Sequence, residues 1–186
     1  LQIRRKRPDW IFMSGWGVMN QVAVKEAAAI NFPMDRFIGN WWSGSENDVL
    51  PAGAGANGYK AATFHPPGGG TKLHADLKKY VYDKGLGAGE WDRTGEVLYL
   101  RGLFNYIMVA EAVRNAQQKF GVKIPSGQQV RDALESISMS AADWERVGLE
   151  GFPEFSISCD DHEDAKAVLF QQWDANAKAW KLISGW

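Results

Sequence analysis

The stretch Pro8-Asp9-Trp10-Ile11-Phe12-Met13-Ser14-Gly15-Trp16-Gly17, together with residues 18–30 behind it, decides the fold class of this chain. Ile11 to Met13 is a short apolar run between a Pro-Asp pair and a glycine-containing segment, which is typical of a strand buried on both faces of a parallel sheet. Residues 18–30 have the composition of a helix, and residues 36–39 form the next short strand-like run. The order strand, helix, strand predicts a parallel β-α-β unit and an α/β fold.

Aromatic and polar residues follow both predicted strands. Ser14-Gly15-Trp16 comes after the first strand, and Asn40-Trp41-Trp42-Ser43 comes after the second. Ligands of open α/β sheets bind at the carboxyl ends of the strands, so we expect these two segments to meet at a small-molecule site. An indole ring offers such a ligand a flat apolar wall and one donor. The alternative is that the tryptophans pack in the core or against a partner, which we expect for Trp10, Trp173 and Trp180 and which stays open for the tryptophans at the strand ends.

Composition excludes several classes of protein. The 186 residues are 45% hydrophobic and 23% charged with a net charge of −1, so no global field favours nucleic acid or an anionic membrane. Cys159 is the single cysteine, which excludes a disulfide scaffold and a cysteine-ligated zinc site. No apolar stretch approaches the roughly 20 residues that cross a bilayer. The basic run at residues 4–7 is expected to be the exposed end of a helix whose beginning is absent, which suggests a truncated chain.

The remaining sequence predicts further helices and strands, separated by glycine- and proline-containing breaks. Residues 65–70 contain two prolines and three glycines and are the strongest candidate for a linker. The helices are expected within residues 45–56, after Thr71, over Val97–Phe120 with Gly121 as its stop, and after the capping-box pattern that begins at Ser126. The strands are expected at residues 58–64, 154–157, 167–173 and 180–183, with a hairpin turn at residues 174–178.

Three patterns that superficially suggest chemistry are better explained by structure. Residues 68–72 lack the order and spacing of a phosphate-binding loop. The three histidines have no metal-ligand spacing, and residues 160–163 are more typical of a turn whose side chains cap backbone amides. The sequence also lacks a convincing pair of nucleophile and base. We therefore expect no metal, no cofactor and no enzymatic activity.

The order of these elements resembles a known family. The motifs are the segment 8–17, Phe37-Ile38-Gly39, Gly58-Tyr59 at the start of the next strand, Asp161-His162, and the closing hairpin that ends at residues 181–186. Over essentially the whole chain they resemble the type I periplasmic solute-binding proteins of ABC importers. The closer resemblance is to the branched-chain amino acid and amide (LivJ/LivK-like) group.

The resemblance implies two α/β lobes, a small amino-acid-like, amide or organic-acid ligand in the cleft between them, and an inner-membrane ABC permease as partner. It implies a periplasmic location or an extracytoplasmic lipoprotein. It also implies that the chain is the C-terminal half of such a protein. Residues 1–66 and 152–186 would then form the second lobe, and residues 71–151 would be helices of the first lobe, whose core strands lie upstream.

One consequence concerns the long helix over residues 97–120. Under that division its apolar stripe, Leu100, Phe104 and Ile107, would face water, and large apolar patches are rarely exposed. We therefore expect a second copy of the chain or a missing N-terminal segment to cover the stripe.

The resemblance also assigns ligand residues. Amino acid binders of this family often carry a carboxylate at the position of Trp41, and an unpaired buried ammonium is unfavourable by several kcal/mol. Trp41 therefore weakens the case for a plain amino acid, unless Glu46 takes over that role, and leaves aromatic or aliphatic acids and amides as candidates. The positions expected to contact the ligand are Trp16 as one wall, Ser14 and Gly15 beside it, Asn40, Trp41, Trp42 and Ser43 as the floor, Ser45 as a further donor, and Glu96 and Tyr99 from the other lobe.

Two other functions compete with transport. The same fold serves as the ligand-sensing domain of receptors and regulators, which the sequence upstream of this chain would distinguish. An α/β enzyme is the third interpretation, and it requires a catalytic constellation that the sequence lacks.

Overall fold

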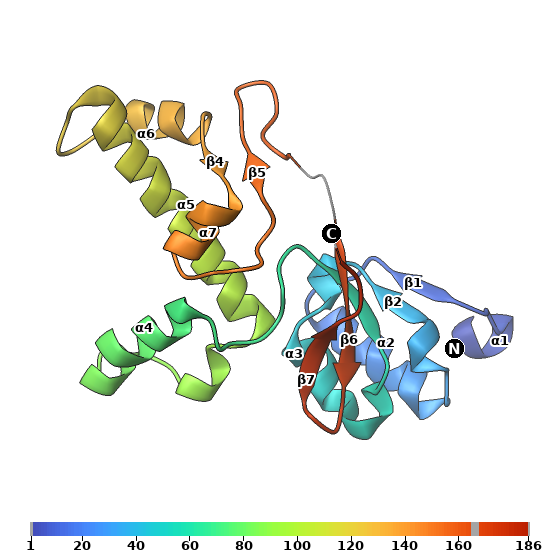
Figure 1. Ribbon diagram of the computed structural model, residues 1–186. Coiled ribbons are helices and arrows are strands. Elements are labelled where there is room, and N and C mark those ends of the chain that lie inside the picture. Colours follow the sequence, from blue (N-terminus) through green and yellow to red (C-terminus); the bar gives the residue numbers. More distant parts are fainter. Residues whose placement is uncertain (1, 165–167, 186) are drawn as a thin grey trace. The chain divides into compact units, whose positions relative to one another are not determined.

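The computed structural model describes residues 2–164 and 168–185, and it divides into two compact units (Figure 1). Unit 1 consists of residues 1–68 and 167–186, and unit 2 consists of residues 69–166. The boundary at residue 68 lies within the proline- and glycine-containing segment 65–70, the predicted linker. Each unit has its own core.

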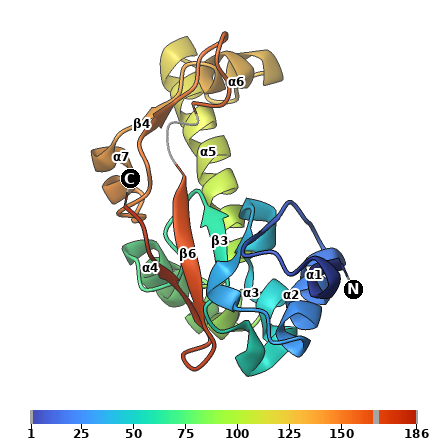
Figure 2. The same ribbon diagram turned by 90° about the vertical axis from the view of Figure 1, so that its right-hand side faces the viewer.

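Unit 1 is built on a five-stranded sheet with the strand order β1-β2-β3-β6-β7. The first three strands, β1 (Ile11–Met13), β2 (Phe37–Gly39) and β3 (Lys60–Thr63), are parallel. The antiparallel hairpin of β6 (Leu169–Asp174) and β7 (Ala179–Leu182) continues the sheet beside β3 (Figure 2). The predicted parallel β-α-β unit and C-terminal hairpin are both confirmed.

Short helices connect the strands of unit 1. The chain starts with α1 (Gln2–Lys6), whose basic residues are exposed as predicted, and α2 (Val18–Ala29) joins β1 to β2. The helix α2 ends where Asn31 takes a left-handed backbone conformation with φ 57°, followed by Pro33, which cannot continue a helix. After β2, the helix α3 (Glu46–Val49) and the 3-10 turns at residues 50–56 lead to β3, as expected for residues 45–56.

Aromatic rings fill the core of unit 1. Phe37 and Tyr59 lie 5.2 Å apart between ring centroids, and Trp173 and Trp180 lie 5.3 Å apart. All four are buried, so the prediction of core packing is confirmed for the last two. Trp10, directly before β1, is 57% exposed and does not pack in this core, so contact with a partner stays the prediction for it.

The strand β1 is less buried than predicted. Phe12, at its centre, is 71% exposed, whereas we expected both faces of this strand to be covered. The reason is its place in the sheet, because β1 pairs only with β2 and forms the edge of the strand order. A continuous apolar run does not distinguish an edge strand from a central one.

Unit 2 is mainly helical. Its helices are α4 (Lys72–Tyr80), α5 (Val97–Phe120), α6 (Gly127–Leu134) and α7 (Ala141–Arg146), with a two-stranded sheet of β4 (Ser138–Met139) and β5 (Phe155–Ser156). Figure 2 shows α5 as one uninterrupted helix with α6 near its C-terminal end. The structure confirms the bounds of α5, the left-handed Gly121 after it, and the capping box of α6 at Ser126.

The core of unit 2 gathers around Trp144, which is fully buried in α7. Its ring centroid lies 5.5 Å from that of Phe104 on α5 and 5.3 Å from that of Phe152. The chain thus covers the stripe of α5 itself, since Leu100 is 1% exposed and both Phe104 and Ile107 pack against this core. Phe104 and Ile107 are only partly buried, so a second copy or an N-terminal segment over the rest of the stripe stays a prediction.

The segment 152–157 packs differently from our expectation. We placed it in the second lobe with the C-terminal strands, but β5 pairs with β4, and Phe155 lies 6.0 Å from Trp144 between ring centroids. These contacts put the segment in unit 2, whose C-terminal boundary is at residue 166. The apolar character of this segment indicated a buried strand but not its partner.

Candidate functional site

The segments that follow β1 and β2 lie side by side at the carboxyl edge of the parallel strands. The register pairs Met13 with Gly39, so Ser14 and Asn40 are the next residues on neighbouring strands. The backbone N–H of Asn40 donates to the carbonyl of Met13 at 2.9 Å, and Asn40 Nδ2 donates to Ser14 Oγ at 3.3 Å. The predicted meeting of the two segments is confirmed.

A buried polar network fixes these two segments. The hydroxyl of Ser43 lies 2.9 Å from the carbonyl of Gly15, 2.9 Å from Asn40 Oδ1 and 3.1 Å from Asn20 Oδ1. One hydroxyl proton serves one of these acceptors at a time. Asn20, in α2, is fully buried and donates through Nδ2 to the carbonyl of Trp42 at 2.9 Å. Side chains from α2 and from both segments therefore hold one another in place.

Asp48 anchors the end of this network. Its Oδ2 accepts hydrogen bonds from the N–H of Ser45 at 2.8 Å and the Ser45 hydroxyl at 2.7 Å, and its Oδ1 accepts one from Asn20 at 3.1 Å. Asp48 is only 4% exposed, so these donors solvate its charge in place of water. The expected role of Ser45 as a ligand donor is therefore in competition with this capping role.

Tyr59 also holds this loop, through a hydrogen bond from its phenol group. Burial, with a smaller contribution from the Asp48 carboxylate, raises the pKa of Tyr59, so the phenol stays protonated and donates to the carbonyl of Ser43 at 3.0 Å. On the other side, Gln171 of β6 donates to the carbonyl of Gly44 at 2.7 Å. Hydrogen bonds thus hold the loop after β2 to α2, to Tyr59 directly before β3, and to β6 of unit 1.

Aromatic side chains form the outer surface of this edge. The rings of Trp41 and Trp42 lie 4.0 Å apart between centroids with planes inclined by 31°, and Phe64, after β3, lies 5.4 Å from Trp41. Trp16, after β1, is 70% exposed, Trp42 is 51% exposed and Phe64 is 39% exposed. We name these four residues the aromatic edge. Each of the three parallel strands contributes to it.

The two expected ligand residues of the other lobe lie in unit 2. Glu96 is the N-cap residue of α5 and forms a two-pronged ion pair with Arg93, with distances of 2.9 and 2.8 Å. Tyr99 is partly buried, and this burial, together with a hydrogen bond to Tyr82, raises its pKa. Both positions stay predictions for ligand contact.

Sequence reasoning missed the residues that position this edge. Asn20 and Tyr59 were not singled out for the site, and Asp48 was expected only as part of a short helix and loop. A signal for Asp48 was present, because Ser45-x-x-Asp48 forms a capping box. Asn20 was detectable only as a polar residue within the mainly apolar and alanine-containing sequence of α2.

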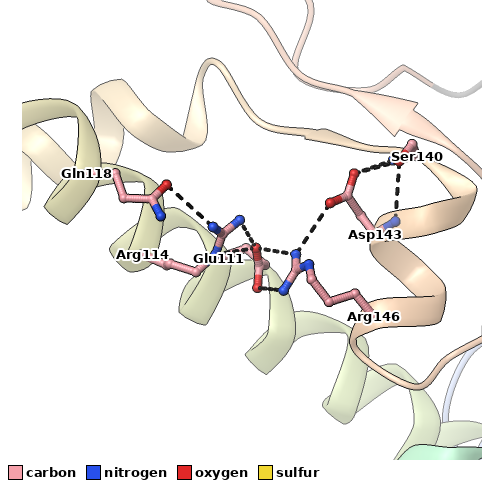
Figure 3. Close-up of polar contacts among 6 residues, drawn as sticks. All are labelled: Glu111, Arg114, Gln118, Ser140, Asp143 and Arg146. Atoms are coloured by element: carbon pink, nitrogen blue, oxygen red, sulfur yellow. Dashed lines mark hydrogen bonds and ion pairs between the residues drawn. The ribbon is translucent and has the colours of Figure 1, made fainter.

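A second polar cluster, in unit 2, joins α5 to α7 (Figure 3). Glu111, whose side chain is 9% exposed, accepts hydrogen bonds from Arg114 at 2.6 Å and from Arg146 at 2.8 Å. Burial by itself raises the pKa of Glu111, but the hydrogen bonds from the two arginines outweigh it and hold the pKa below its usual range. Asp143 pairs with Arg146 at 3.4 Å, so the cluster contains two carboxylates and two arginines whose charges balance. The ion pair of Glu111 with Arg146 links α5 to α7.

We expect Glu111→Gln to lower the free energy of unfolding of unit 2 by about 1.5 kcal/mol at pH 7, because charge-assisted bonds to half-exposed arginines are lost. Since the folded pKa of Glu111 is lowered, this contribution is complete above its unfolded pKa and is lost as the pH falls through the folded value. Urea unfolding at pH 7 and at pH 3 measures the change. Glu145→Gln, at an exposed position on α7, is the control; an equal loss in both variants would contradict this account.

Other features of unit 1 and unit 2 offer less for a ligand. An open hollow of about 450 Å³ lies at the amino edge of the strands, and two of its three charged residues, Lys181 and Asp174, pair with each other at 2.6 Å. Asp161 accepts backbone N–H bonds from Glu163 and Asp164, which confirms the predicted capping turn.

Among residues 2–164 and 168–185, no group of three or more His, Cys, Asp or Glu side chains is placed to hold a metal ion.

Comparison with known families identifies the chain. The family model described as periplasmic binding protein matches residues 1–178. The chain belongs to the periplasmic binding protein family. No match was found among curated proteins. Its α/β architecture, with a sheet dominated by parallel strands and flanked by helices, is that of the type I fold of this family.

Solved structures of other proteins resemble this chain. One described as an ABC transporter permease from the Pseudomonas fluorescens group is 42% identical, with a TM-score of 0.88 over 100% of this chain and 45% of that chain. A branched-chain amino acid ABC transporter protein from Thermus thermophilus, with bound valine, is 17% identical with a TM-score of 0.73 over 99% and 47%. The leucine-binding protein LivK from Thermotoga maritima is 12% identical with a TM-score of 0.65 over 97% and 45%.

This periplasmic binding protein chain spans about half the length of the structures it matches. Among these relatives, the protein from Thermus thermophilus is described as an ABC transporter with bound valine, and the protein from Thermotoga maritima is described as leucine-binding. Within the described part of the chain, no helix is long and apolar enough to cross a membrane.

Proposed function

We propose that this chain is the C-terminal half of an extracytoplasmic solute-binding protein of the branched-chain amino acid and amide group, which delivers its ligand to an ABC permease. The ligand is a small amino-acid-like molecule, amide or organic acid. The observation that carries the proposal is the aromatic edge, since Trp41 and Trp42 pack together after β2, and the exposed Trp16 follows the neighbouring strand β1, at the edge where open α/β sheets bind ligands. Family membership supports transport over catalysis.

The geometry of the carboxyl edge supports ligand binding in a second way. Ser14 is exposed, and its hydroxyl accepts from Asn40 Nδ2, which leaves the hydroxyl proton to donate to a ligand oxygen. Beside it stand apolar rings, so the edge combines a few fixed polar atoms with apolar surface, as small-molecule sites do. We assign ligand contact to Ser14, Trp16, Asn40, Trp41 and Trp42. Gly15 and Ser43, which we also expected at the ligand, are buried and bonded to each other, so we assign them to the support of this surface. Glu96 and Tyr99 complete the assignment from the other lobe.

The first test replaces Trp16, which is 70% exposed and can therefore be removed without opening the core. In the full-length protein, Trp16→Ala should weaken ligand binding tenfold or more, or about 1.4 kcal/mol, because one wall of the site is lost. Isothermal titration calorimetry with leucine, phenylalanine, benzoate and benzamide covers the proposed ligand classes.

The matched control is Trp10→Ala, which removes a tryptophan of similar exposure, 57%, from the opposite end of β1. It should leave affinity unchanged. An unchanged affinity in Trp16→Ala would refute the role of Trp16, and the absence of binding by every compound in the set would refute the proposed ligand classes.

A further inference from the structure

The aromatic edge presents a layered arrangement of rings. Trp41 and Trp42 are nearly stacked, at 4.0 Å and 31°, and Phe64 meets Trp41 at 60°. Trp42 remains half exposed in this arrangement, and Phe64 is 39% exposed. A ring that adds to this group gains favourable offset or edge-to-face contacts, which a saturated group of the same size does not provide.

The backbone of Trp42 is anchored by hydrogen bonds on both sides. Its backbone N–H donates to Asn40 Oδ1 at 3.0 Å, and its carbonyl accepts from Asn20 Nδ2 at 2.9 Å. Both peptide groups beside the Trp42 side chain are therefore fixed, and Asn20 is fully buried. Because this backbone is already ordered, less conformational entropy is lost when a ring binds to Trp42.

The carboxylate of Asp48, which lies in the same loop, is not available to a ligand ammonium. It is 4% exposed, and Ser45 and Asn20 donate three hydrogen bonds to it. The charge of Asp48 serves to hold the loop closed on itself. The same loop exposes the ring of Trp42 and the side chain of Asn47, and Glu46 is half-buried.

We propose that the ligand carries a planar aromatic ring, which stacks on Trp42 at the carboxyl edge of unit 1. This inference rests on the proposed solute-binding function and narrows it to one ligand class. Ring-on-ring contact adds roughly two- to tenfold in affinity beyond the gain from buried area. An aromatic ring is thus the part of the ligand that Trp42 recognises.

The test compares ligands that differ only in aromaticity. Calorimetry on the full-length protein is carried out with three pairs: benzoate and cyclohexanecarboxylate, phenylalanine and cyclohexylalanine, and benzamide and cyclohexanecarboxamide. In at least one pair the aromatic member should bind roughly two- to tenfold tighter than the saturated one. The same pair is then measured with Trp42→Ala, which should abolish the preference, and with Trp10→Ala, which should preserve it.

The possible outcomes separate this inference from the proposed function. If ligands bind but the two members of every binding pair have equal affinity, the aromatic inference is overturned and the solute-binding function stands. A preference that persists in Trp42→Ala overturns the assignment to Trp42. If none of the six compounds binds, both proposals are contradicted for the ligand classes named.

Discussion

Gly39→Ala is expected to lower the free energy of unfolding of unit 1 by about 3 kcal/mol. A Cβ atom at this position would lie 2.1 Å from Tyr59 Oη and 2.7 Å from Ser43 Cβ. Both neighbours are fully buried and hydrogen-bonded, so neither can move aside without loss. Glycine is therefore required at the end of β2 by close packing. Urea unfolding followed by far-UV circular dichroism measures the change.

A double substitution tests the cause. Tyr59→Phe removes the oxygen nearest to the added methyl group, so Gly39→Ala should be less destabilising when combined with Tyr59→Phe than in the unaltered protein. Gly185→Ala is the control, because a Cβ there meets no atom within 4 Å. Additive effects of the two substitutions would contradict the proposed clash.

Trp144→Ala is expected to have the largest effect on stability, lowering the free energy of unfolding of unit 2 by about 4 kcal/mol. The indole is fully buried, and its ring contacts Phe104 and Phe152. Its Nε1–H also donates to the carbonyl of Pro153 at 2.7 Å, which would lose its partner. Hydrogen exchange measured by mass spectrometry should show faster exchange throughout α5 and α7.

Tyr106→Ala is the matched control for this substitution. Tyr106 is an aromatic residue of α5 with 78% exposure, so its removal should change the free energy of unfolding by less than about 0.5 kcal/mol. If Trp144→Ala were no more destabilising than Tyr106→Ala, the core of unit 2 would not be where the structure places it.

Local sequence signals predicted the helices and strands well. Gly121 with φ 64° and the capping box at Ser126 are backbone requirements that particular residue types satisfy, so the end of α5 and the start of α6 could be predicted. The same holds for the hairpin turn, where Asp174 Oδ1 accepts N–H bonds from Asn176 and Ala177.

Partners in space could not be predicted in the same way. Phe12 and Trp10 are apolar and were expected to be buried, yet β1 lies at the sheet edge. The stripe of α5 was expected to face water without a further segment, but Trp144 and Phe152 of the same chain pack against Phe104. The type of a residue indicates how favourable its burial is, but not which neighbouring residues cover it in the fold.

The candidate site shows the same division. Topology alone brought Ser14 and Asn40 together, because carboxyl ends of adjacent parallel strands meet at one edge. The network of Asn20, Ser43 and Asp48 depends on side-chain distances between α2 and the loop after β2, and no spacing rule encodes these.

The most direct test of the account is ¹⁹F NMR of the full-length protein labelled with 5-fluorotryptophan, with signals assigned by single Trp→Phe substitutions. The protein is titrated with whichever of the six compounds binds most tightly. The account predicts that the signals of Trp16, Trp41 and Trp42 shift, while those of Trp10, Trp173 and Trp180 stay in place. Shifts confined to the second group would contradict it and place the ligand elsewhere.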